Sequence, residues 1–162
     1  MSRIRLVWPG KTREAPLRQL IEEYTKRLRR FARCELVELP DSQFSQRHDV
    51  IAHDSRRLAS ALAPSSSSAV SDQRRILLDV EGEALSSHDV ADRLQRWQND
   101  SLRCFTFAIG GPEGVDRAIL EPHVDEIWSL SPMTFTHEMA RVLLLEQIYR
   151  GFSIIHNMPY QK

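Results

Sequence analysis

Apolar residues recur along this chain in short runs separated by polar turns, and the spacing within each run predicts its secondary structure. Runs of five or six apolar or alternating residues that end near glycine, proline or aspartate are typical of β-strands. Runs in which apolar residues stand three and four apart predict amphipathic helices. These patterns predict strands at 4–8, 34–39, 75–80, 104–109 and 125–130. They predict helices at 17–31, 50–62, 88–97, 115–120 and 136–152.

The order of these elements predicts an α/β fold, a mostly parallel sheet with helices on both faces, because strand and helix alternate almost throughout. The strand at 75–80 is continuously apolar, as expected in a sheet that is covered on both sides. Ser87 is expected to cap the helix at 88–97. The serine run at 65–68 is interpreted as a loop inside a single domain that spans residues 1–162.

Three loops are the candidate ligand-binding positions of this fold. In open α/β sheets, ligands bind outside the carboxyl ends of the strands, where the connecting loops gather. The loops that follow predicted strands in this way are residues 81–82, 110–114 and 131–135. We therefore expect them to meet at one edge of the sheet.

The composition is that of an ordinary folded protein, with 41% hydrophobic and 27% charged residues among 162. No apolar run approaches the roughly 20 residues that a membrane span needs, and the apolar stretch at the N-terminus is too short for a signal-peptide core. We expect a cytoplasmic protein without a membrane partner. Cys34 and Cys104 lack the spacing of a metal or redox site, so they are interpreted as core thiols and no metal is expected.

The net charge is zero, but the charge is unevenly distributed along the chain. Residues 1–33 carry ten basic and three acidic side chains, a net charge of +7, so the remaining 129 residues carry −7. This asymmetry indicates a basic face for a polyanion. The alternative, to which we give equal weight, is that these basic residues only form the solvent-exposed surface of a helix.

The segment Gly110–Gly114 concentrates three of the six glycines between a strand and a helix. A phosphate cradle is the first hypothesis for such a loop, but Pro112 lacks an amide donor and Glu113 adds negative charge. No lysine or arginine lies inside the loop. A neutral adenosine with a cationic sulfonium fits the loop better than a phosphate. Glu113 alternatively only complements the N-terminal dipole of the next helix.

A series of motifs in the second half of the chain resembles a known family. The motifs are, in order, Ile109-Gly110-Gly111-Pro112-Glu113-Gly114, Trp128-Ser129-Leu130-Ser131, His137 with Arg141-Val142-Leu143, Tyr149-Arg150, and Asn157-x-Pro159-Tyr160. Together they resemble the large-subunit pseudouridine N3-methyltransferases, small SPOUT-class enzymes that act on helix 69 of 23S rRNA. The resemblance spans essentially the whole chain, and the combination is far more specific than the glycine motif alone.

The resemblance implies a homodimer, a C-terminal half tied in a deep trefoil knot, and S-adenosylmethionine as methyl donor. General topology rules make knots very rare, so the pattern alone did not predict one. The family's cofactor pocket, carried over, lies at Leu78, Gly110, Leu130, Ser131, Pro132, Met133, Thr134 and Phe135. These positions coincide with the strand-end loops that were chosen on general grounds.

The resemblance also implies the residues that handle the RNA base. Alignment of an electrophilic methyl group with N3, and removal of the N3 proton, are what the protein must supply. His137 and Arg141 stand four apart and share a helix face, and with Tyr160 they are the candidates for positioning the base and its phosphates. Arg150 lies nine residues from Arg141, faces the other way, and is placed at the dimer interface or against the partner's pocket.

Each of these candidates also has a purely structural interpretation. His137 stands near a helix start and is alternatively a capping residue. Arg141 could pair with Glu138, and Arg150 with Glu146, as surface ion pairs that contribute roughly 0.3–0.5 kcal/mol each. The unbroken apolar run that follows Arg141 in the same helix indicates burial on both sides, by the core and by a partner subunit.

The C-terminus departs from the family pattern. Gln161 stands where many members have a histidine, and Met158 stands where a histidine is also common. An amide cannot accept a proton near neutral pH, so solvent or Tyr160 is left as the proton acceptor. Tyr160 is alternatively a packing residue that pins the terminus. These departures favour a rival function, a catalytically weakened SPOUT-like module that binds RNA or ribosomes. A phosphate-binding α/β protein is a further, weaker alternative.

Overall fold

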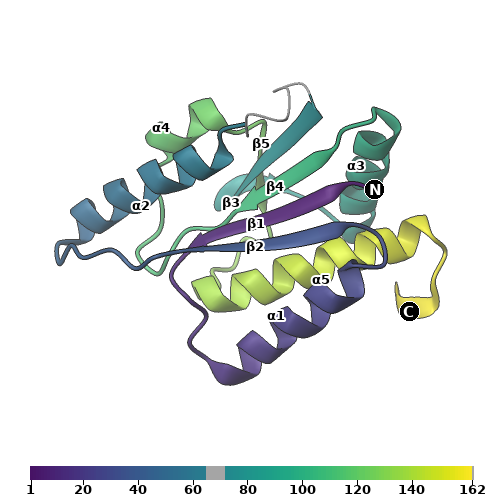
Figure 1. The fold of residues 1–162 in the computed structure, drawn as a ribbon, viewed down its shortest axis with the longest axis horizontal. Helices are drawn as coiled ribbons and strands as arrows, with labels where there is room; N and C mark the ends of the chain where they lie inside the picture. Colours follow the sequence, from purple (N-terminus) through teal and green to yellow (C-terminus); the bar gives the residue numbers. More distant parts are fainter. Residues whose placement is uncertain (65–71, 162) are drawn as a thin grey trace.

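The computed structural model describes residues 1–64 and 72–161, and its strands form one five-stranded sheet (Figure 1). The strands are β1 (Arg3–Pro9), β2 (Arg33–Leu39), β3 (Gln73–Ala84), β4 (Cys104–Ala108) and β5 (Glu126–Ser129). Their order across the sheet is β2-β1-β4-β3-β5, and every neighbouring pair is parallel. The predicted α/β fold with a parallel sheet is therefore confirmed. The predicted break at Ser65–Ser68 and the side chain of Gln161 lie outside the described residues.

Helices cover both faces of the sheet, as predicted. They are α1 (Ala15–Leu28), α2 (Arg47–Leu62), α3 (Ser87–Asn99), α4 (Arg117–Leu120) and α5 (His137–Ile155), with short 3-10 turns at Glu121–His123 and Pro159–Gln161. Helices α1, α3 and α5 share one apolar core with the sheet, and α2 and α4 share another on the opposite face. Most boundaries agree with the sequence prediction within three residues; β3 and α5 are longer than predicted at their carboxyl ends.

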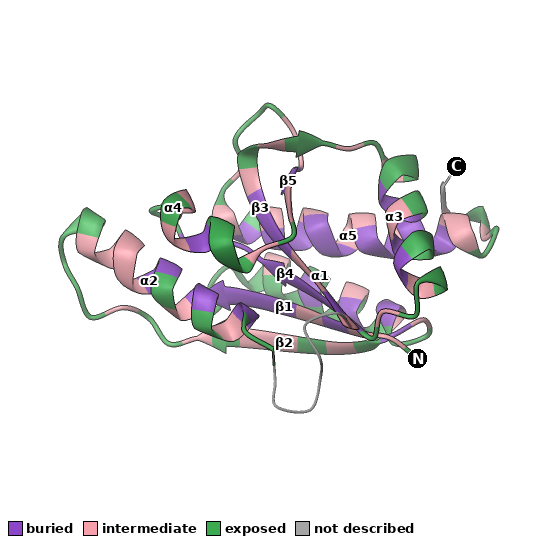
Figure 2. Ribbon diagram, turned by 90° about the horizontal axis from the view of Figure 1, so that it is seen from above, coloured by how far each residue is buried: buried purple, intermediate pink, exposed green. Residues whose placement is uncertain are grey.

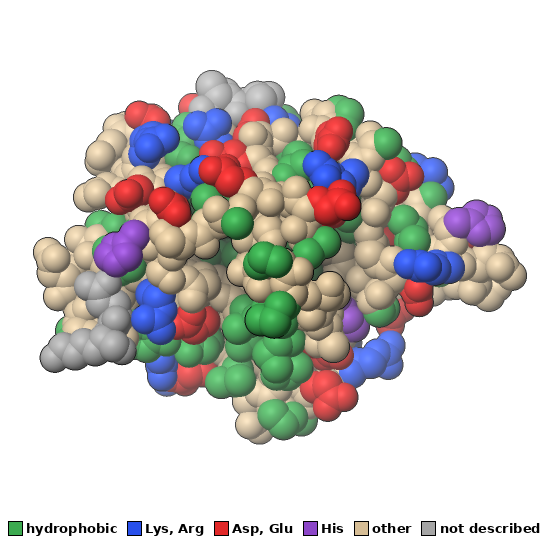
Figure 3. Space-filling model, turned by 180° about the vertical axis from the view of Figure 1, so that it is seen from behind, with side chains coloured by type: hydrophobic (Ala, Val, Ile, Leu, Met, Phe, Trp, Pro, Cys, Tyr) green, Lys and Arg blue, Asp and Glu red, His purple; other side chains and the backbone are tan. Residues whose placement is uncertain are grey.

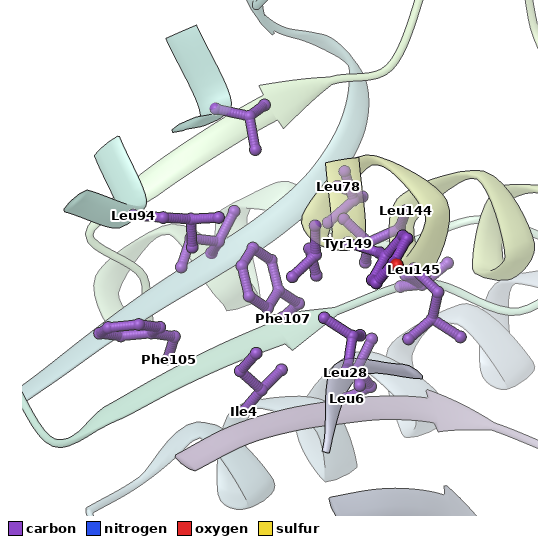
Figure 4. Packing of buried hydrophobic residues seen from close by; sticks show 14 of the residues in the cluster. Ile4, Leu6, Leu28, Leu78, Leu94, Phe105, Phe107, Leu144, Leu145 and Tyr149 are labelled. Carbon is purple, nitrogen blue, oxygen red and sulfur yellow. The ribbon is translucent and has the colours of Figure 1, made fainter. Parts of the chain in front are cut away.

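Strand alternation divides the apolar residues between these two cores. Along β1, Ile4, Leu6 and Trp8 point toward α1 and α5, while Val7 points toward α2. Figure 4 shows the larger core, in which Ile4 and Phe107 from the strands meet residues of α3 and α5. Buried residues concentrate in β1, β4 and α5, whereas the edge strand β2 is largely half-buried or exposed (Figure 2). The central strands therefore hold rigidly the loops that leave their carboxyl ends.

The cap of α3 differs from the prediction by one residue. The N-cap is Ser86, not Ser87: the Ser86 hydroxyl accepts a hydrogen bond from the Asp89 amide at 3.1 Å. The Asp89 carboxylate accepts in turn from the Ser86 amide at 2.8 Å. This reciprocal pair requires an acidic or amide side chain three residues after the serine, and Asp89 meets that spacing only for Ser86.

Both cysteines are free thiols that lie in strands of the sheet. Cys104 is buried in β4, and Cys34 is half-buried in β2, where burial raises the pKa of its thiol to about 11. A thiol with so high a pKa is a poor nucleophile, which agrees with a packing role. None of the described helices is both long and apolar enough to cross a bilayer. That residues 1–162 form one domain stays a prediction.

Candidate functional site

A cavity of about 640 Å³ opens at the carboxyl ends of β3, β4 and β5. Its size is that of a small-molecule or cofactor site. Figure 3 shows hydrophobic side chains gathered in the middle of one face, beside a hollow, with charged groups around them. Two of the three loops selected from the sequence contribute to the walls, the glycine turn after Ile109 and the loop after Leu130. The selected residues 81–82 do not line the cavity, and Leu78, Asp79 and Val80 line it instead. The expected meeting at one edge of the sheet is therefore confirmed for the second and third loops.

The glycine turn owes its path to two positions that exclude a side chain. A Cβ on Gly110 would lie 2.6 Å from Cγ1 of Val115, closer than real contacts allow. Gly114 has φ of +92°, a conformation that favours glycine. The neighbouring helix α2 supports the turn, because the Ser55 hydroxyl accepts a hydrogen bond from the Asp116 amide at 2.8 Å. The cavity therefore has a narrow, backbone-lined wall that a flat ring can approach.

The second wall of the cavity is formed near the end of β3, where the pairing of β3 with β5 is interrupted. Leu78 pairs with Trp128, and the pairing resumes at Glu83, which also faces Trp128. The residues between them, 79–82, bulge out of the ladder. A Cβ on Gly82 would lie 2.7 Å from the Trp128 carbonyl carbon, so the two backbones lie in close contact. Asp79 and Val80 reach the cavity from this bulge, and the predicted residues 81–82 do not.

The third wall is the loop between β5 and α5. Its turn is closed locally: the Ser129 hydroxyl donates to the Ser131 carbonyl at 3.0 Å, and the Ser131 hydroxyl accepts from the Met133 amide at 3.0 Å. Seven of the eight predicted cofactor positions line the cavity: Leu78, Gly110, Leu130, Ser131, Met133, Thr134 and Phe135. Pro132, the eighth, is exposed and is absent from the lining.

A fourth wall was missed by the sequence reasoning. Glu14 and Leu17, at the start of α1, line the cavity opposite the glycine turn. Glu138 on α5 holds them there, because its Oε1 accepts hydrogen bonds from the Arg13 and Glu14 amides at 2.5 and 3.0 Å. Burial alone would raise the pKa of Glu138, but these amides, His137 and Arg141 lower it below its usual value. The carboxylate therefore stays ionised and fixes the N-terminal wall.

The charged groups in the lining favour a cationic ligand. Three acidic residues, Glu14, Asp79 and Glu138, line the cavity, and no lysine or arginine does among the residues that the structure describes. Such a lining attracts a sulfonium and holds a phosphate poorly. His137 completes this end, and burial together with the nearby Arg141 lowers its pKa below 6.5. Its imidazole is therefore neutral at physiological pH and has one nitrogen that accepts a proton.

Arg141 lies beneath the cavity rather than in it. The side chain is fully buried, with Cζ 4.8 Å from the centre of the Trp8 ring. Its guanidinium donates to the Pro9 carbonyl at 2.8 Å and to the Thr12 hydroxyl at 3.0 Å, not to Glu138 as the surface alternative proposed. Burial lowers its pKa to about 10, so it remains charged. Its predicted contact with the base is untested; its observed contacts tie α5 to the loop between β1 and α1.

Arg150 and Tyr160 lie at the other end of α5, away from the cavity lining. Arg150 pairs with Glu146 at 2.7 Å, the surface pair that was weighed as an alternative. Tyr160 donates to the same carboxylate at 3.1 Å, and its hydroxyl lies 3.0 Å from that of Tyr24. Burial and the bond to Tyr24 raise the pKa of Tyr160 well above its usual value. The phenol therefore stays protonated in this chain and is a poor proton acceptor.

The structure thus divides the four predicted catalytic residues. His137 is at the cavity, Arg141 is buried below it, and Arg150 and Tyr160 form a separate cluster. The residues that were missed, Glu14 and Glu138, carried a weak signal: each is an acidic residue next to a predicted helix start, where dipole complementation is the ordinary interpretation.

Comparison with known proteins identifies relatives over nearly the full chain. A family model described as "Predicted SPOUT methyltransferase" matches residues 2–161. Proteins named "Ribosomal RNA large subunit methyltransferase H" are similar: that of Geobacter sp. (strain M21) is 41% identical over 158 residues, with 98% of this chain and 97% of the relative covered. The proteins of that name from Geobacter sulfurreducens and Pelobacter propionicus are 40% and 35% identical, with 98% of both chains covered in each case.

Proposed function

Because this chain belongs to the SPOUT methyltransferase family, we propose that it methylates the RNA of the large ribosomal subunit, at N3 of a pseudouridine in helix 69 of 23S rRNA. The observation that carries the proposal is a cofactor-sized cavity at the carboxyl edge of the sheet, lined by carboxylates without lysine or arginine. The relatives are named for large-subunit rRNA methylation. Such an enzyme acts in the cytoplasm, where ribosomes are.

The cavity suits S-adenosylmethionine as the methyl donor. When bound, this donor supplies an electrophilic methyl group on a sulfonium. Leu78, Leu130 and Phe135 offer apolar contacts for the adenine, and the Gly110 backbone is open to close approach. The carboxylates complement the positive sulfur. Pro132 is proposed to contact the methyl donor only through its backbone.

His137 is proposed to handle the N3 proton. Methyl transfer to N3 requires that nitrogen to lose a proton, and a neutral imidazole at the cavity is a suitable acceptor. The lowered pKa keeps His137 neutral at the pH of the cell. Tyr160 is protonated within its own chain and bonded to Glu146, so it is better suited to contact the RNA than to accept a proton.

The separation of the candidate catalytic residues along α5 supports a homodimer. His137 and Arg150 are separated by about 20 Å along α5, so one chain cannot bring both to one base. Leu20 and Met139, exposed by 42% and 38%, lie on α1 and α5, two helices that pack together. A second copy on this apolar surface would place the Arg150 and Tyr160 of one subunit near the cavity of the other. The trefoil knot in the C-terminal half is proposed from membership of the family alone.

Calorimetry with S-adenosylmethionine and S-adenosylhomocysteine tests the cofactor. We expect binding by the wild type and its loss in Gly110→Val, which fills the wall beside Val115. Gly111→Ala in the same turn, whose Cβ would make only ordinary contacts with Asp54 and Pro9, serves as a control for glycine replacement. Folding of each variant is checked by its melting temperature. Absence of heat from the wild type at millimolar ligand contradicts the proposal.

Mass spectrometry of helix 69 separates the enzyme from the rival binding module. Ribosomes from a strain that lacks the gene are incubated with the purified protein and donor. A mass gain of one methyl group on the pseudouridine supports turnover. Donor binding without any methyl transfer would assign the chain to the weakened module, in which Gln161 has replaced a functional histidine.

A further inference from the structure

A second charged region lies at the amino ends of the strands, at the opposite edge of the sheet from the cavity. Arg3 begins β1, Arg33 begins β2, and Arg103 immediately precedes β4. Arg29 and Arg30 follow α1 at the same edge. We call these five residues the arginine edge. In Figure 1 this is the end of the molecule that carries the N-terminus, while α5 begins at the other end.

The backbone brings these arginines together. Arg3 and Arg33 are register partners on adjacent parallel strands. The Arg3 amide donates to the Arg103 carbonyl at 2.8 Å, and the Arg33 amide donates to the Ser2 carbonyl at 2.9 Å. Arg29, Arg30, Arg33 and Arg103 are exposed, and Arg3 is half-buried. The first strands and the end of α1 therefore present a cluster of guanidinium groups to solvent.

The arginine edge differs from the cavity end in how its charges are balanced. Two exposed cations near the cavity have carboxylate partners: Arg13 pairs with Asp41 at 2.9 Å, and Arg47 pairs with Glu113 at 3.2 Å. Within the described parts of the chain, none of the five arginines of the edge forms an ion pair.

The carboxylate closest in sequence to Arg33 on its own strand is already engaged. Glu35 pairs with Arg5 at 3.4 Å. Like charges on neighbouring strands disfavour the fold unless a counter-charge is near. Four of the five edge arginines belong to residues 1–33, a segment whose net charge of +7 calls for negative groups. A polyanion from outside would supply them.

We propose that the arginine edge binds the phosphate backbone of ribosomal RNA at a place remote from the methylated base. Guanidinium groups form paired hydrogen bonds with phosphate oxygens. The seven residues of β1 separate the edge from the cavity by roughly 20 Å, so the contact lies on other nucleotides than the target. The proposal rests on RNA being the substrate, but it does not depend on the chemistry of the cavity.

Removal of two edge charges tests the proposal. Arg33→Gln with Arg103→Gln is compared with Arg56→Gln with Arg96→Gln, a control that removes the same charge from exposed arginines of α2 and α3. Binding to large ribosomal subunits is measured over a series of salt concentrations. We expect the edge variant to bind about tenfold more weakly and its salt slope to fall by about 1 for each arginine. The control is expected to match the wild type.

The outcomes separate this proposal from the proposed function. Donor binding in calorimetry is expected to be unchanged in both variants, because neither pair of arginines touches the cavity. Equal affinity and equal salt slope in the edge variant, the control and the wild type would overturn the proposal. Weakened binding to intact subunits but not to protein-free 23S rRNA would assign the edge to an acidic ribosomal protein and also overturn it. Failure of methyl transfer by the wild type would instead count against the proposed function.

Discussion

The two ends of α5 carry functional candidates of the same residue types but use them differently. At its start, Glu138 and Arg141 are buried and bond to backbone groups more than 120 residues away in sequence. At its end, Glu146 and Arg150 are partly exposed and pair with each other, one turn apart. The start is therefore a fixed part of the cavity wall. The end is a surface cluster that holds the C-terminal segment and is open to a partner.

This difference teaches that spacing along a helix does not tell which charged residues work together. A carboxylate and an arginine three or four residues apart form a local pair at the end of α5 and no pair at its start. What decides is the surrounding backbone: at the start, the loop between β1 and α1 presents unsatisfied amides and carbonyls, which buried charged groups satisfy well.

The largest expected difference between the ends concerns stability. Arg141→Ala leaves the Pro9 carbonyl and Thr12 hydroxyl without their donor and opens a void against Trp8, so we expect a loss of about 3 kcal/mol. Arg150→Ala breaks a partly exposed ion pair and should cost under about 1 kcal/mol. Urea denaturation measures both. Equal losses would show that the two ends are equivalent.

A substitution of His137 tests the start of α5 through its effect on turnover. His137→Gln is expected to lower kcat about 100-fold, because an amide cannot accept the proton, with little change in donor affinity. Because burial and Arg141 lower the pKa of His137, the acid limb of kcat in the wild type should fall below pH 6.5. The folded state favours the neutral form, so stability declines as the pH drops below the ordinary histidine pKa of 6.5 toward that lowered pKa. An acid limb that persists in His137→Gln would contradict this role.

Glu138 and Glu146 provide a matched pair of carboxylates. Glu138→Ala frees the Arg13 and Glu14 amides and loosens the N-terminal wall, so the dissociation constant for S-adenosylhomocysteine should rise about tenfold, or 1.4 kcal/mol. Glu146→Ala, at the far end of the helix, should leave it unchanged. Calorimetry measures both, with Glu138→Gln as the variant that keeps an acceptor oxygen and most of the affinity. A similar loss in Glu146→Ala would link the two ends within one subunit.

The smallest expected effect lies in the tyrosine cluster. Tyr24→Phe and Tyr160→Phe each remove one side of a hydrogen bond and should each destabilise the fold by about 1 kcal/mol. The double variant should cost little more than Tyr160→Phe alone, because Tyr160→Phe already removes the contact between the two hydroxyls as well as the bond to Glu146. Denaturation of all four proteins completes the cycle. Strict additivity would show that the two hydroxyls do not interact.

Much of the site followed from local sequence. Gly110 and Gly114 marked a turn because no other residue accommodates their contacts and φ. The apolar stretches before Leu78 and Leu130 marked strands whose carboxyl ends had to gather at one edge. The wall from Glu14 and Leu17 could not be predicted in this way, because it depends on a loop from the first strand meeting the last helix.

The order of apolar and polar residues by itself determined the parallel sheet, its two covering layers and two of the loops of the cavity, since each depends on periodicity or on steric needs of single residues. Only the tertiary structure decided that Arg141 is buried under the site, that Glu138 fixes a fourth wall, and that Arg150 and Tyr160 stand apart from His137. These assignments depend on bonds between residues far apart in the chain, and the free energy of burying a charge depends on which backbone groups surround it. No local pattern records those partners.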